Sequence, residues 1–175
     1  DVWSIALPAT LAFITEPLAG LVDLTVIGRL GDANLLGGMV LGALAFDFLF
    51  SLAFFLRLGT AGLVAQAVGR RDPNEGLIHF SRATLVGVGI GFGLLALTVP
   101  LQWLAVSSLG PAPEVIAPLE TYLGVRMWSA ALVLINFALL GWFYGRAAAG
   151  TGLLLQWNVN GLNINWLILF VHRFG

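Results

Sequence analysis

The chain has 175 residues, of which 59% are hydrophobic and 10% are charged, and its mean hydropathy is +0.95. This composition is far from that of an ordinary soluble domain and predicts a protein whose solvent is lipid. The sequence has no cysteine, which excludes a disulfide framework, a zinc cluster built on cysteines and a thiol nucleophile. The eight basic residues are all arginine and occur singly or as one pair, so a nucleic-acid-binding stripe is not expected.

Five long apolar stretches make up most of the chain. They cover residues 2–28, 34–68, 77–106, 115–145 and 150–171. Each reaches the length of about 20 residues that a helix needs to span a bilayer. Short polar turns separate them, of which GRRDPNEG at 69–76 carries the most charge. We therefore expect an all-α polytopic membrane protein with five transmembrane helices and, because the sequence opens with Asp1, a fragment of a longer chain.

The arginines near the ends of the stretches predict an orientation. With the N-terminus in the cytoplasm, four arginines lie at cytoplasmic ends and two at outer ends. The four are Arg70, Arg71, Arg82 and Arg146, and the two are Arg29 and Arg173.

Two carboxylates interrupt the first stretch. Glu16 and Asp23 are seven residues apart, which places them on nearly the same helix face, roughly 10 Å apart along the axis. An ionised carboxylate at mid-bilayer costs roughly 2.5–3.5 kcal/mol, so this face is expected to meet protein or water. One interpretation is a carboxylate paired with an arginine for packing, and the other is a site that takes up and releases a proton. Pro8 and Pro17 each remove a helix hydrogen bond and are candidate hinges.

The second stretch carries Asp47 and Arg57. Arg57 is interpreted either as the counter-ion of a membrane carboxylate or as a side chain that extends to the cytoplasmic interface. Arg126 in the fourth stretch is expected to be anchored at the outer interface, and His79 is expected to be a solvated surface residue.

Glycines recur at four-residue intervals, which allow helix backbones to approach closely in lipid. They are Gly38 with Gly42, Gly87 with Gly91, and Gly89 with Gly93. The segment GVGIGFG lacks the spacing of a nucleotide-binding loop and follows no strand-like run, so packing is its expected role.

Three amide side chains form a stripe in the last stretch. Gln156, Asn160 and Asn163 follow one another at intervals of four and three residues and so share one helix face. The stripe predicts either hydrogen bonds between helices or a polar cavity wall that faces Glu16 and Asp23.

At this level of detail the sequence resembles the multidrug and toxic compound extrusion (MATE) transporters, and within them the branch named for the DNA-damage-inducible F protein. The resemblance rests on EPLAGLVDLTVIGRLGDANLLGG at 16–38 and FFLRLGTAGLVAQAVGRRD at 54–72, and less closely on GLNINWLILFV at 161–171. It implies twelve transmembrane helices in two six-helix lobes, and export of organic compounds against an inward proton or sodium gradient. Residues 1–175 would then be most of the N-terminal lobe, and the second half of the transporter would be the missing partner.

The resemblance also implies roles for single residues. Asp23 matches the family's first-helix aspartate, which is implicated in cation coupling, and Pro8 matches the proline where that helix bends. Asn163 matches an asparagine that lines the cavity of the lobe. Leu167 stands where the family often has an acidic residue, which favours protons over sodium as the coupling ion.

The leading hypothesis is a secondary active exporter of amphipathic or cationic compounds in the inner (plasma) membrane. Asp23 and Glu16 would couple the cation, and Asn163, Asn160, Gln156 and Arg57 would line the cavity, with no metal and no cofactor beyond the coupling ion. The alternatives are a flippase for lipid-linked precursors and an intramembrane aspartyl protease that uses Asp23 and Asp47. No G-x-G-D motif accompanies either aspartate, which argues against the protease. A purely structural membrane subunit is a further class, which the desolvation cost of the carboxylates argues against.

Overall fold

The structure, a computed structural model, describes residues 2–29 and 31–174. The side chains of residues 2, 4, 5, 9, 12, 13, 15–17, 19, 23 and 27, and of residues 167, 168, 170–172 and 174, lie outside the described part. The described residues form eight helices and no strand, so the predicted all-α fold class is confirmed. The helices are α1 (Val2–Gly28), α2 (Ala33–Leu52), α3 (Phe55–Gly69), α4 (Pro73–Ala96), α5 (Thr98–Leu109), α6 (Pro113–Met127), α7 (Ala130–Gly145) and α8 (Ala149–Phe174).

Three of the predicted stretches are broken near their middle, which the sequence analysis did not anticipate. Between α2 and α3, the amides of Ala53 and Phe54 donate to carbonyls three residues earlier, so the helix tightens for one turn. Between α4 and α5, the Thr98 hydroxyl donates to the Leu95 carbonyl at 2.7 Å. Between α6 and α7 the axis bends by 54°, where the Ser129 hydroxyl donates to a backbone carbonyl of the preceding turn. Side chains that bond to nearby carbonyls compete with the helix ladder and favour such breaks.

Several helices are long and apolar enough to cross a membrane. Among the described residues, α2 with α3 (Ala33–Gly69) as one span and α4 meet that criterion by length and composition, and α6 with α7 does so if the bent pair is one span. With 27 and 26 residues, α1 and α8 also exceed the length of about 20 residues that a span needs.

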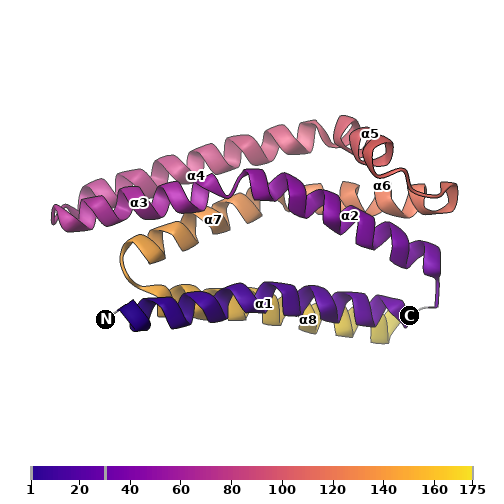
Figure 1. Cartoon of the computed structure of the whole chain (residues 1–175), viewed down its shortest axis with the longest axis horizontal. Coiled ribbons are helices and arrows are strands. Elements are labelled where there is room, and N and C mark those ends of the chain that lie inside the picture. The colour runs from indigo at the N-terminus through magenta and orange to yellow at the C-terminus, as the bar shows by residue number, and fades with distance from the viewer. Residues whose placement is uncertain (1, 30, 175) are drawn as a thin grey trace.

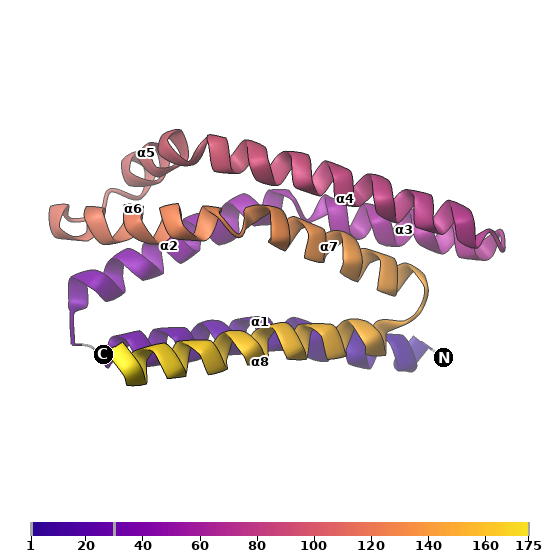
Figure 2. The same ribbon diagram turned by 180° about the vertical axis from the view of Figure 1, so that it is seen from behind.

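The helices are arranged as a bundle and a separate pair. In the bundle, formed by α2–α7, α2 packs on α6, and α7 packs on both α3 and α4. The pair consists of α1 and α8, which lie side by side along their lengths and run in the same direction (Figures 1 and 2). The described hydrophobic core belongs to the bundle and includes Phe46, Leu56, Leu123, Met127 and Leu134.

Glycines mark the closest helix contacts in the bundle. A Cβ atom added to Gly91 on α4 would lie 2.3 Å from the Cα atom of Ala131 on α7. A Cβ atom on Gly38 would lie 2.7 Å from the backbone nitrogen of Leu119 on α6. A Cβ atom on Gly42 would lie 2.6 Å from the Tyr122 ring on α6, and one on Gly87 would lie 3.3 Å from the Leu134 backbone on α7, so all four predicted contact glycines are confirmed.

Gly89 and Gly93 do not make the contacts that their spacing predicts. A Cβ atom added to either would meet nothing within 4 Å in the described part of the chain, and both are exposed. The two pairs are offset by two residues, which corresponds to about 200° around the helix axis, so they lie on opposite faces of α4. Only the first of these faces meets α7.

A further glycine pair was missed by the sequence analysis. Gly141 and Gly145 on α7 also stand four residues apart. Cβ atoms at these positions would lie 2.5 Å from the Arg57 carbonyl oxygen and 2.7 Å from the Ala61 carbonyl oxygen. These glycines therefore bring the backbone of α7 directly against α3.

Candidate functional site

The predicted coupling residues lie on α1. Glu16, Pro17 and Asp23, and also Leu167 on α8, have side chains outside the described part of the chain. What is described is the backbone around them, in which α1 remains one helix from Val2 to Gly28 and packs along α8. Pro8 is partly buried within this helix.

The amide stripe of α8 changes its surroundings along the helix. Gln156 is only 5% exposed, and its side-chain oxygen accepts a hydrogen bond of 3.1 Å from Asn136 on α7. Asn160 is partly buried and Asn163 is exposed. Gln156 thus joins α8 to the bundle, whereas the Asn163 side chain is exposed within the described part of the chain.

Asn136 was missed because it is a single amide in an apolar stretch with no periodic partner on its own helix. Its partner is 20 residues away in the sequence. Only the turn between α7 and α8 brings the two amides together, and no local pattern gives that geometry.

Arg57 is buried where α3 meets α7. It is 3% exposed, and its Nη2 atom donates a hydrogen bond of 2.9 Å to the Tyr144 hydroxyl. Its guanidinium carbon lies 5.4 Å from the Phe54 ring centre and 5.0 Å from the Tyr144 ring centre. Contacts with ring faces stabilise a cation that has left water.

The burial of Arg57 has a local cause. Gly141 lets α7 approach the backbone of Arg57, and Tyr144 follows Gly141 by three residues, so it lies on the same side of α7. The interpretation that Arg57 extends to the interface is therefore wrong. Arg57 lies inside the helix packing of the bundle.

A second arginine joins α2 and α6. The Nη1 atom of Arg126 donates to the Tyr122 hydroxyl at 2.5 Å, and its guanidinium carbon lies 4.5 Å from the Phe46 ring centre. The partly buried Arg126 thus packs across the α2–α6 contact.

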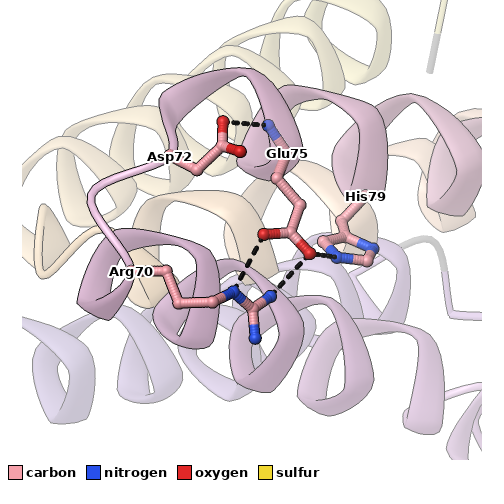
Figure 3. A network of polar contacts seen from close by, with 4 residues as sticks. All are labelled: Arg70, Asp72, Glu75 and His79. Carbon is pink, nitrogen blue, oxygen red and sulfur yellow. Dashed lines mark hydrogen bonds and ion pairs between the residues drawn. The ribbon is translucent and has the colours of Figure 1, made fainter.

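Polar contacts order the turn between α3 and α4 (Figure 3). Arg70 donates to both carboxylate oxygens of Glu75, at 3.0 and 2.6 Å. The Nε2 atom of His79 lies 3.5 Å from Glu75, and the His79 side chain is 16% exposed, so it is less solvated than predicted. The Asp72 carboxylate accepts from the Glu75 amide at 3.0 Å and caps the N-terminus of α4.

The family profile described as MatE matches residues 8–165 of the chain. The chain belongs to the MatE family. This confirms the resemblance found in the sequence.

The relatives of this MatE chain include proteins named as exporters. The chain is 38% identical over 173 residues to the DNA damage-inducible protein F of Escherichia coli strain K12. This alignment covers 97% of the chain and 38% of that relative. The chain is 23% identical over 134 residues to the multidrug export protein MepA of Staphylococcus aureus strain NCTC 8325 / PS 47. This alignment covers 77% of the chain and 30% of that relative. The chain therefore spans less than two fifths of the length of these relatives.

The fold also matches a solved structure. A MOP superfamily transporter from Pyrococcus furiosus Vc1 (DSM3638) superposes with a TM-score of 0.87 and 21% identity, over 98% of this chain and 38% of that one. Members of the MatE family are integral membrane transporters and not enzymes, so the protease alternative is set aside.

Proposed function

We propose that the full-length protein is a secondary active exporter of amphipathic, often cationic, organic compounds. Membership in the MatE family carries this proposal, and the named activity of the multidrug export relative supports the substrate class. The exporter would reside in the inner (plasma) membrane with its N-terminus in the cytoplasm, as the arginine bias favours.

Cation coupling is assigned to Asp23, with Glu16 as a secondary polar contact. The packing of α1 along α8 supports this assignment, because it brings the helix with both carboxylates beside the helix with the amide stripe. Asn160 and Asn163 would then contribute to the cavity wall. Gln156 would serve mainly to join α8 to α7, since it is buried against Asn136.

Protons are the proposed coupling ion. A sodium site needs several oxygen ligands, and Leu167 supplies none where the family often has a carboxylate. Protonation of Asp23 would change the bend of α1 at Pro8 or Pro17 and so the shape of the cavity. A difference in substrate affinity between the two shapes would couple proton entry to release.

Transport by the full-length protein in liposomes tests the proposal. An outward flux of a fluorescent organic cation should appear when an inward proton gradient is imposed, and a sodium gradient of equal size should drive little flux. Liposomes that contain the Asp23→Asn variant control for leakage through the protein. Flux driven only by sodium would overturn the choice of ion, and translocation of a labelled lipid precursor without cation flux would overturn the substrate class.

A further inference from the structure

Two helices of the bundle end in the same backbone motif. At the end of α3, the Arg71 amide donates to Val68 and the Asp72 amide to Ala67, at 2.9 and 3.0 Å. At the end of α7, two amides make the corresponding bonds to Tyr144 and Phe143. This is the Schellman pattern, in which one residue takes the left-handed conformation that usually belongs to glycine.

In this chain neither left-handed position is a glycine. Arg71 has φ 59° and Ala147 has φ 56°. Glycine adopts such a φ at no steric cost, whereas a residue with a Cβ atom is strained there. Strained backbone positions cluster at functional sites, so the strained Arg71 is a candidate for a functional side chain.

Arg71 lines a pocket of about 200 Å³ at this end of the bundle. The pocket lies where the end of α3, the start of α4 and the end of α7 meet, near the turns that Figure 1 places at the same end as the N-terminus. Val64, Val68 and Trp142 form an apolar wall, and Arg71, Arg146 and Asp72 supply the charges.

Some of the charged side chains around the pocket have partners within the protein, and others do not. The neighbouring Arg70 is held by Glu75, and the Asp72 carboxylate caps α4 (Figure 3). Arg146 lies over the Trp142 ring at 4.6 Å. The Arg71 guanidinium has no hydrogen bond or ion pair within the described part of the chain. The pocket thus presents two guanidinium groups that no carboxylate among the described residues neutralises by an ion pair.

We propose that this pocket binds the phosphate headgroup of an anionic phospholipid of the surrounding membrane. The pocket lies at the ends of membrane-crossing helices, and Trp142 is the kind of residue that marks the membrane–water interface. Guanidinium groups in basic pockets between transmembrane helices suit phosphate oxygens. Val68, Leu77 and Ile78 are about half exposed beside the pocket or directly after it on α4, and acyl chains would cover them. A free phosphate would leave this apolar surface in water, so a lipid is the better occupant.

Binding of short-chain phosphatidylglycerol to the full-length, delipidated protein in detergent tests the proposal. Thermal stability is followed as the lipid is titrated, with short-chain phosphatidylcholine and glycerol 3-phosphate as separate arms. Each arginine near a membrane surface contributes about fivefold in affinity for anionic lipid. Arg71→Gln and Arg146→Gln should each weaken phosphatidylglycerol binding roughly fivefold, and the double variant roughly 25-fold.

Two further variants keep the test decisive. Arg82→Gln removes an exposed arginine on α4 that does not line the pocket, and it should bind phosphatidylglycerol like the unmodified protein. Arg71→Gly relieves the left-handed strain, so it should fold at least as stably while it loses the same affinity as Arg71→Gln. Unchanged binding in the double variant, or an equal loss in Arg82→Gln, would overturn the site. Glycerol 3-phosphate that binds as tightly as phosphatidylglycerol would overturn the lipid as its occupant.

Discussion

The bundle of α2–α7 and the α1–α8 pair are held by different contacts. In the bundle, glycines on α2, α4 and α7 let backbones meet, and the described apolar core fills the space around them. In the pair, the glycines at 20, 150 and 161 have no atom of the described chain within 4 Å of an added Cβ atom. The two helices of the pair nevertheless lie along one another (Figure 2).

The close backbone contacts of the bundle make it resistant to rearrangement. Backbones in direct contact cannot slide without steric clashes, because packed interfaces are not continuously deformable. The described contacts between α8 and the bundle lie near the start of α8 and include the Asn136–Gln156 hydrogen bond and the packing of Gly152 against Tyr144 and Leu140. We therefore expect the α2–α7 bundle to tolerate substitutions at its helix contacts poorly.

The largest effect is expected from closing a glycine contact in the bundle. Gly91→Ala places a Cβ atom against the backbone of Ala131. Overpacking of this kind should lower the free energy of unfolding by roughly 1–3 kcal/mol or more. Gly89→Ala is the matched control, since its Cβ atom meets nothing within 4 Å among the described residues. Thermal unfolding of the full-length protein in detergent should show a clear loss for the first variant and none for the second. Equal losses would remove the distinction between the two faces of α4.

The buried arginine gives the next largest effect. Tyr144→Phe removes the acceptor of the Arg57 hydrogen bond inside the bundle, which should lower stability by roughly 1–3 kcal/mol. Tyr122→Phe removes the corresponding acceptor of Arg126 and should cost less, because Arg126 is only partly buried and its guanidinium can be solvated. Chemical unfolding of both variants under the same conditions compares them. A larger loss of stability for Tyr122→Phe would contradict this order and show that the polar contact of Arg126 contributes more than that of Arg57.

The hydrogen bond between the bundle and the pair should contribute less. Asn136→Ala removes the donor to Gln156, and such bonds in membranes average about 0.6 kcal/mol. Asn158→Ala is the control on α8, because its amide bonds only to Leu154 of its own helix among the described residues. Protease susceptibility of the α7–α8 turn should rise in the first variant and remain unchanged in the second. Unchanged susceptibility in Asn136→Ala would mean that other contacts hold α8.

The smallest effect is expected at the α3–α4 turn. Glu75→Gln removes the carboxylate that Arg70 binds, but the ion pair is solvent-exposed and such pairs contribute little. Any loss of thermal stability should vanish at high salt, where exposed charges are screened. A large loss that persists in high salt would show that this turn holds the bundle together.

Much of the bundle could be predicted from the sequence, because four-residue glycine spacing is a local signal. Gly38, Gly42, Gly87 and Gly91 were found in that way. The same spacing also selected Gly89 and Gly93, since it does not say which face of a helix meets a neighbour. Gly141 and Gly145 carried the signal and were overlooked in an aromatic segment.

The breaks and the buried polar contacts could not be predicted. The turns at Ala53 and at Ser129 contain neither proline nor glycine, and both are marked by amides that donate to carbonyls three residues earlier. Arg57 meets Tyr144 across 87 residues of sequence. Such pairs arise from tertiary packing, so a single sequence gives the residue types but not the partners. The coupling roles of Asp23 and Glu16 were predicted from their shared helix face, and for Asp23 also from the family resemblance.

The pH dependence of export by Asp23→Asn is the most direct test of the coupling assignment. The amide preserves the shape of the side chain and removes its titration, so folding should be retained while gradient-driven export is abolished. Glu16→Gln should reduce export and keep its pH dependence. The measurement is the initial rate of cation export from liposomes that contain the full-length protein, at several pH values, with thermal stability as the folding control. Normal rates with an unchanged pH profile in Asp23→Asn would remove this carboxylate from the mechanism and leave Glu16 as the next residue to test.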